Sequence, residues 1–244
     1  MRNKVEVTCA WSGVAFIVLY GVFFAGVAHY IPPPAPNWSA ERVGEWYGEH
    51  TNAIRAGQLG AMAASFLLFP LWALITAHLA RIEMARGRFP LLALIQFGNA
   101  VLLQVYFVLC SMIWIAATFR DELAPDTVRM LHDLGWLMFV MVAPGYLLQM
   151  ICIGLAAFLD TDPDPVFPRW AGYFHLWVGV SGVGGALAVF FKDGPFAWNG
   201  LVAFYIPVAV FLAWLCIITA LLHRRAARTP VSAFALPTRE RVLA

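Results

Sequence analysis

The sequence predicts an all-α protein, a polytopic transmembrane bundle of about six antiparallel helices with short interfacial helices on the outer side. Of the 244 residues, 61% are hydrophobic and only 12% are charged, whereas a soluble domain has roughly 45–50% apolar and 25% charged residues. Runs of about 20 residues contain no Asp, Glu, Lys or Arg, and a helix needs this length to cross a bilayer. These runs lack the alternation of barrel strands, so helices are favoured.

The lipid bilayer is therefore the expected surrounding of the chain. The net charge of only +2 gives no reason to expect a nucleic-acid partner. We expect one integral membrane domain over residues 1–244. Its spans are predicted at 9–31, 55–79, 89–119, 134–159, 170–191 and 196–222, and residues 223–244 are predicted to form a cytoplasmic tail.

Prolines mark the predicted ends and bends of these spans. The first span ends at Pro32 and the two prolines after it, because proline cannot continue a helix. Pro70, Pro144 and Pro207 lie inside the second, fourth and sixth spans, where they predict kinks. Short connections between the spans favour antiparallel neighbours.

Two outer segments are predicted to be helical as well. Residues 39–55 read as an amphipathic helix that lies flat on the membrane, with Ser39 or Asn37 as its N-cap and Trp38 in the headgroup layer. Pro125 is acceptable in a first helical turn, so it predicts the start of a helix that continues into the fourth span.

The distribution of Lys and Arg predicts the orientation in the membrane. With a cytoplasmic N-terminus, the outer side carries Arg42, Arg55, Arg120, Arg129 and Lys192. The cytoplasmic side then carries Arg2, Lys4, Arg81, Arg86, Arg88, Arg169, Arg224, Arg225, Arg228, Arg239 and Arg241. Both termini are therefore expected in the cytoplasm. A bacterial inner membrane is the expected location, because the cytoplasmic loops are short and no organelle signal is present.

Polar residues gather at the predicted outer ends of the spans. Such groups are costly at membrane depth, so they are candidates for a ligand or ion path. The candidate ligand-binding residues are Arg55, Asn52, Arg120, Asp133, Lys192 and Asn199. They would form a polar mouth through which a small molecule binds or crosses. The alternative is that helix ends carry polar residues simply because they meet water.

Three histidines, His29, His50 and His132, fall in the same outer region, so a metal or haem site is a further hypothesis. The chain lacks a His-x-x-x-His or Cys-x-x-Cys motif, and histidines at interfaces commonly only form hydrogen bonds. We therefore expect no cofactor, with haem or a metal as the alternative. No catalytic residue can be nominated, and whether the chain is an enzyme stays open.

Polar residues also lie deeper in the spans. Gln58, Gln96, Gln104 and Gln149 are predicted to form hydrogen bonds between helices. His175 lies in an aromatic-rich stretch that suits an aromatic or quinone-like ligand, although an aromatic belt is the preferred explanation.

Span 170–191 carries a face of small residues, Gly179, Gly182, Gly184 and Gly185, on which a helix can pack closely. A second copy of the chain or a partner in a membrane complex is therefore conceivable on this face. Three hypotheses follow from the sequence. The first is binding or translocation of a small molecule through the outer mouth, the second an accessory subunit of a membrane complex, and the third a membrane-bound oxidoreductase that uses the outer histidines.

Overall fold

The computed structural model describes residues 4–228, and within that range the chain contains helices and no strands. Six helical stretches are long and apolar enough to cross a membrane, which confirms the predicted all-α transmembrane bundle. In chain order they are α1 (Lys4–Gly21) with η1 (Val22–Val27), α2 (Ala40–Ser65) with α3 (Leu68–Ala85), α4 (Leu91–Ala116), α5 (Pro125–Val140) with α6 (Ala143–Leu159), α7 (Arg169–Ser181) with α8 (Val183–Ala186) and η2 (Leu187–Phe190), and η3 (Leu201–Tyr205) with α9 (Ile206–Arg228). Arg2, Arg239, Arg241 and the tail beyond residue 228 lie outside the described residues.

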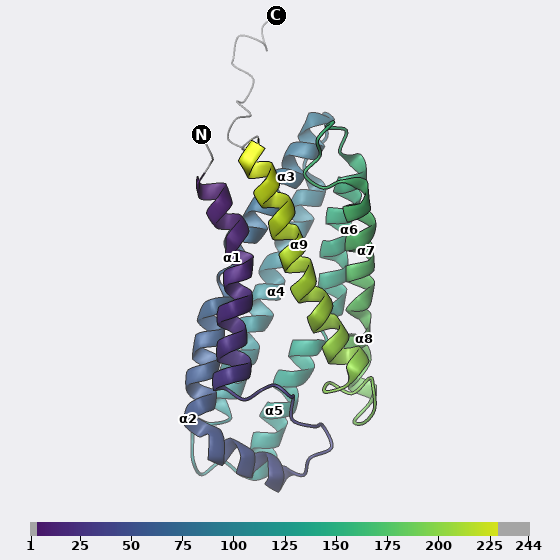
Figure 1. Ribbon diagram of the computed structural model, residues 1–244. Coiled ribbons are helices and arrows are strands. Elements are labelled where there is room, and N and C mark those ends of the chain that lie inside the picture. Colours follow the sequence, from purple (N-terminus) through teal and green to yellow (C-terminus); the bar gives the residue numbers. More distant parts are fainter. Residues whose placement is uncertain (1–3, 229–244) are drawn as a thin grey trace, which may run out of the picture.

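Helix α1 begins and helix α9 ends at the same end of the bundle, which we call the proximal end (Figure 1). The two helices pack together there, since Thr219 Oγ1 donates a hydrogen bond of 3.0 Å to the Ala10 carbonyl oxygen. Trp11 Nε1 donates to His223 Nδ1 one turn nearer the proximal end, at 3.2 Å. The opposite, distal end holds the first turns of α2 and α5 and the loop that precedes η3 (Figure 1).

The segment predicted to lie flat on the outer surface is part of the second membrane-spanning stretch. Helix α2 runs without interruption from Ala40 to Ser65, and its first turns lie across the distal end (Figure 1). Ser39 is its N-cap, as predicted, and its Oγ accepts a hydrogen bond of 3.3 Å from the Arg42 backbone N–H. Asn37, the alternative cap, instead donates to Asp193 at 2.6 Å.

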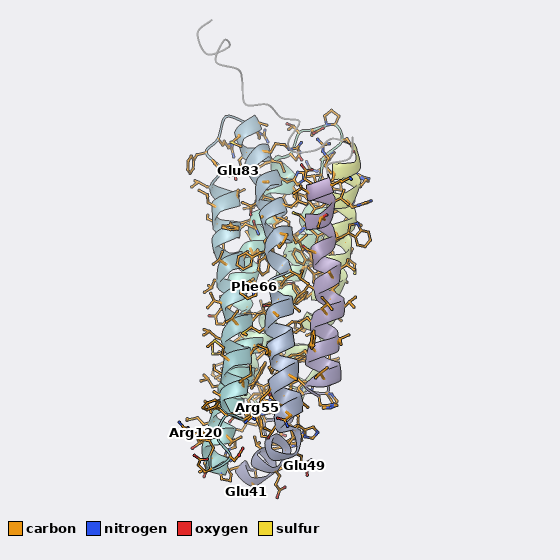
Figure 2. The ribbon with its side chains drawn as sticks, turned by 90° about the vertical axis from the view of Figure 1, so that its left-hand side faces the viewer. Glu41, Glu49, Arg55, Phe66, Glu83 and Arg120 are labelled. Carbon is orange, nitrogen blue, oxygen red and sulfur yellow. The ribbon has the colours of Figure 1, made fainter. Side chains whose placement is uncertain are left out.

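The helices are interrupted where the prolines predict it. The break between α2 and α3 lies at Phe66 and Leu67, and the ring nitrogen of Pro70 cannot donate to the Phe66 carbonyl four residues earlier. Pro144 follows the break between α5 and α6 in the same way, and Pro207 follows the π-helical turn η3. These three irregularities lie within the membrane-spanning stretches, and Figure 2 shows Phe66 midway along the bundle.

Helix α4 packs against α2, α3, α5 and α6. Buried side-chain amides of α2 and α4 bridge it to its neighbours, as the sequence predicts. The bridges join Gln104 Nε2 to Ser65 Oγ at 2.6 Å, Thr76 Oγ1 to Gln96 Oε1 at 2.7 Å, and Ser111 Oγ to Gln58 Oε1 at 3.1 Å. Each bridge between membrane helices contributes about 0.6–2 kcal/mol to stability.

The glycine face of span 170–191 is used within the chain. A Cβ atom on Gly179 would lie 3.0 Å from Met150 Cβ of α6, and one on Gly184 would lie 2.6 Å from the Val202 carbonyl oxygen of η3. A Cβ on Gly182 would meet the Tyr146 ring at 2.8 Å. The small residues therefore allow α7 and α8 to approach α6 and η3 of the same molecule.

Candidate functional site

The predicted ligand-binding residues at the distal end have different environments. The Arg55 guanidinium donates to the carbonyl oxygen of Thr118 and, from Nε, to its hydroxyl at 3.2 Å, so it satisfies the C-terminal end of α4. Arg120 points to the surface, where it pairs with Glu122 at 3.9 Å, and both side chains are largely exposed. Figure 2 shows Arg55 and Arg120 near each other at the distal end, but they contact different partners.

The remaining members of the predicted mouth lie on α2, on α5 and in the loop before η3. Asn52 is exposed on α2, and Lys192 is exposed in the loop before η3. Asp133 on α5 and Asn199 before η3 are partly buried. Within residues 4–228, no hydrogen bond or ion pair joins any two of the six candidates. Their role in binding stays a prediction.

The three outer histidines do not face one common point. His132 is buried, and its Nδ1 is hydrogen-bonded to the Tyr47 hydroxyl at 3.1 Å, which is bonded in turn to the Tyr30 hydroxyl at 2.9 Å. His29 and His50 are neighbours, with ring centroids 5.4 Å apart. Among the described residues, no group of three or more His, Cys, Asp and Glu side chains is arranged to hold a metal ion. Ligation by these histidines stays a prediction.

A layer of closely packed aromatic rings lies between this distal region and the middle of the bundle. The Tyr30 ring lies 4.8 Å from that of Trp114 and 5.5 Å from that of Trp136, and the two indoles are 5.2 Å apart. All three side chains are fully buried. Gly135 makes the packing feasible, because a Cβ atom there would clash with Nε1 of the Trp114 ring. The layer separates the distal polar residues from what lies beneath.

Beneath the aromatic layer is a cavity of about 120 Å³. Helices α4, α6 and α9 form most of its wall, at the level where α5 breaks before α6 and where η3 gives way to α9. These proline-linked irregularities displace the helices from regular packing, which leaves space between them. Rings contributed to the wall include those of Trp72, Tyr106, Phe107, Phe139, Phe204 and Phe211.

Three further residues in the cavity wall carry buried polar atoms without a hydrogen-bond partner. They are the Tyr146 hydroxyl, Gln149 Nε2 and Trp214 Nε1. Leaving such a group unsatisfied costs about 1–3 kcal/mol. No charged residue contributes to the wall, so the arrangement suits the binding of a neutral molecule and offers no acid, base or nucleophile of ordinary strength.

Helices α1 and α9 diverge beside the cavity. They remain in contact as far as Phe16 and Phe211, whose ring centroids are 6.3 Å apart. Further toward the distal end, Tyr20 of α1 packs against Phe107 of α4, and Phe24 of η1 stacks on Phe139 of α5. Figure 1 shows the two helices diverging there, with α4 and α5 behind them. No α1 residue lines the cavity, and its wall residues on α4 and α9 include partly exposed ones.

A second polar cluster lies at the proximal end. Arg225 of α9 is buried and pairs with Asp162 at 2.8 Å, while Arg81 of α3 lies 3.8 Å from the same carboxylate. The backbone N–H of Asp164 donates to Asp162 at 3.1 Å, and this bond together with the arginine charges lowers the pKa of Asp162. The cluster ties α3 and α9 to the loop between α6 and α7. These ion pairs stabilise the packing of the three segments, and they were not predicted from the sequence.

Glu83 is another buried carboxylate that sequence reasoning missed. Its two oxygens accept the backbone N–H groups of Leu92 and Ala93, each at 3.0 Å, so the end of α3 caps the start of α4 (Figure 2). A negative charge is favourable at a helix N-terminus. Glu83 lies nine residues before Leu92, across a loop, and this spacing resembles no standard capping motif. The cap was therefore not predictable from the sequence.

Fold and site together define a polytopic integral membrane protein with an internal, aromatic-lined cavity. No family model matches the chain, and no curated protein or solved structure matches it either. Its function must therefore be argued from the cavity itself, since a helical bundle alone does not define one.

Proposed function

We propose that the protein binds a small, mainly apolar molecule in the central cavity, and that this molecule enters from the bilayer between α1 and α9. The observation that carries the proposal is the cavity of about 120 Å³ with its aromatic wall at the middle of the membrane-spanning stretches. An apolar cavity of roughly 150 Å³ in another protein is known to hold benzene. The space therefore matches a molecule with one ring.

Entry from the bilayer is favoured over entry through the distal mouth. A molecule that passes from Arg55 and Asp133 to the cavity would have to displace the layer of Tyr30, Trp114 and Trp136, which are fully buried. Entry between α1 and α9 would instead pass the partly exposed wall residues of α4 and α9, and a mainly apolar molecule concentrates in the bilayer. The distal residues would then contribute to binding only if the aromatic layer opens.

The orientation proposed for the protein places the proximal end in the cytoplasm of a bacterium, with the bundle in the inner membrane. Lys4, Arg81, Arg169, Arg224 and Arg225 all lie at that end. This is the excess of positive charge that cytoplasmic ends of membrane helices carry.

Benzene, which has one ring and no polar groups, is a suitable probe of the cavity. The thermal unfolding midpoint is measured in lipid nanodiscs with and without benzene. A ligand at 100 times its Kd stabilises a protein by about 2.7 kcal/mol, so we expect benzene to raise the midpoint of the natural chain.

The test rests on two matched substitutions. Ala203→Phe places a ring in the cavity wall and should abolish the shift. Ala73→Phe adds the same ring at an exposed position of α3 and should leave the shift intact. No shift in the natural chain, or an equal shift with Ala203→Phe, would show that benzene only partitions into lipid and would contradict the proposal.

A further inference from the structure

Two histidines at the distal end come close together from different elements. His29 follows the last turn of η1, and His50 lies on α2 next to Glu49, which Figure 2 shows at the distal end. Their ring centroids are 5.4 Å apart, with an angle of 69° between the ring planes. The His29 side chain is exposed and that of His50 is partly exposed, so the pair is accessible to dissolved ions.

The backbone holds His29 in a fixed position. Its φ angle is 59°, a left-handed conformation that is uncommon for residues other than glycine, although histidine adopts it more often than most. The residues on either side, Ala28 and Tyr30, are fully buried. Their backbone N–H groups donate to carbonyl oxygens of η1 at 2.9 and 3.1 Å. The exposed imidazole is therefore presented from a turn that both neighbours anchor in the bundle.

The hydrogen bond of His50 leaves one of its ring nitrogens free. Its Nδ1 lies 2.9 Å from the Trp46 carbonyl oxygen, one turn earlier on α2, and the two rings are stacked with centroids 5.0 Å apart. A carbonyl oxygen only accepts, so the neutral imidazole carries its proton on Nδ1 and a lone pair on Nε2. Within residues 4–228, Nε2 of His50 and the ring nitrogens of His29 have no hydrogen-bond partner. Histidines that ligate metals commonly donate their other N–H to a carbonyl in this way.

The separation of the two rings agrees with a shared metal ion. A Zn–N bond of about 2.0–2.1 Å and a further 1.1 Å or so to the ring centre place each centroid about 3.2 Å from the ion. Two such rings at the tetrahedral angle have centroids about 5.2 Å apart, close to the 5.4 Å between His29 and His50. Rotation of the His29 ring about its Cβ–Cγ bond redirects its nitrogens and leaves its centroid in place, so both rings can point a nitrogen at one ion without backbone movement.

We propose that His29 and His50 together bind one Zn²⁺ ion, or a similar late transition-metal ion, with water in the remaining positions. Imidazole nitrogen suits Zn²⁺, Cu²⁺ and Ni²⁺, whereas Mg²⁺ and Ca²⁺ prefer oxygen ligands. The ion joins the loop after η1 to α2. Two side chains suffice here, and the described residues contain no cluster of three or more ligands. The proposal leaves out His132, which is buried and bonded to Tyr47, and it is independent of the cavity.

Calorimetric titration with zinc chloride tests the site in the full-length protein, freed of any affinity tag and held in phosphatidylcholine nanodiscs. We expect one Zn²⁺ per chain and no binding of Mg²⁺. His29→Asn keeps a residue that tolerates a positive φ, and His50→Gln keeps a polar side chain of similar length. Loss of a group that only orients a ligand weakens metal binding about 10–100-fold, so each substitution should weaken zinc binding by about tenfold or more.

His223→Asn is the matched control, because His223 is a partly exposed histidine at the proximal end and should leave zinc affinity unchanged. Electron paramagnetic resonance of the natural chain with one equivalent of Cu²⁺ needs no variant, and it should show coupling to two imidazole nitrogens. Absence of zinc binding, unchanged zinc affinity in either His29→Asn or His50→Gln, or coupling to fewer than two nitrogens would overturn the proposal.

Discussion

Arg225 provides the most quantitative prediction about the stability of the bundle. Its side chain is only 7% exposed and lies 2.8 Å from the Asp162 carboxylate, which is 30% exposed. Removing one partner of a fully buried pair costs about 3–5 kcal/mol because the other charge stays buried. Asp162 is partly solvated and keeps Arg81 at 3.8 Å, so we expect Arg225→Met to cost about 2–3 kcal/mol.

Unfolding by denaturant in detergent micelles measures this loss. Arg224→Met is the control, because Arg224 and its partner Asp164 are half exposed and 3.5 Å apart, so it should cost about 0–1 kcal/mol. A double-mutant cycle of Arg225→Met with Asp162→Asn should show a coupling of about 1–2 kcal/mol. If Arg224→Met costs as much as Arg225→Met, or if the cycle is additive, the reasoning about burial is refuted.

Three other predictions concern the rest of the structure. The pKa of Asp162 is lowered from its usual value of 3.8, so its stabilising effect is complete above that pH and is lost as the pH falls through the lower, folded-state value; acid unfolding should be less steep in Asp162→Asn, and an identical pH profile would contradict this. Gly135→Ala would place a Cβ in a clash with Nε1 of the Trp114 ring, so it should lower stability by about 1–3 kcal/mol and change near-ultraviolet circular dichroism, whereas Gly98→Ala, in open space on α4, should do neither. Glu83→Gln should cost about 1–2 kcal/mol because α4 loses a charged cap, and unchanged amide exchange at Leu92 and Ala93 would argue against that role.

The fold was predictable where local chemistry decides it. The three interruptions of the membrane-spanning helices were predictable from Pro70, Pro144 and Pro207, because a missing backbone N–H disturbs a helix wherever it occurs. Ser39 was identifiable as a cap from its position before an amphipathic segment. The glutamine bridges followed from the requirement that polar groups at membrane depth find partners. Residues 39–55 were predicted as an interfacial helix, and in the structure this helix continues into the second span as α2, with its first turns across the distal end (Figure 1).

The cavity was not predictable from the sequence. Its wall combines Trp72, Phe107, Tyr146 and Trp214 from four helices, and such rings resemble lipid-facing ones such as Trp177 in the sequence. Which rings face inward depends on how the helices rotate and cross. The same limit applies to the distal residues, because span position gives their depth but not their direction around the bundle. Arg55 therefore caps α4, while Arg120 faces solvent.

The central claim, that the cavity holds a small ring from the bilayer, is tested most directly by the anomalous scattering of bromobenzene in crystals of the protein. We expect a bromine peak inside the cavity, in contact with Phe139, Phe211 or Trp214. The peak should disappear in crystals of Ala203→Phe. Bromine density confined to the lipid-facing surface, or a cavity without any peak at saturating bromobenzene, would contradict the claim.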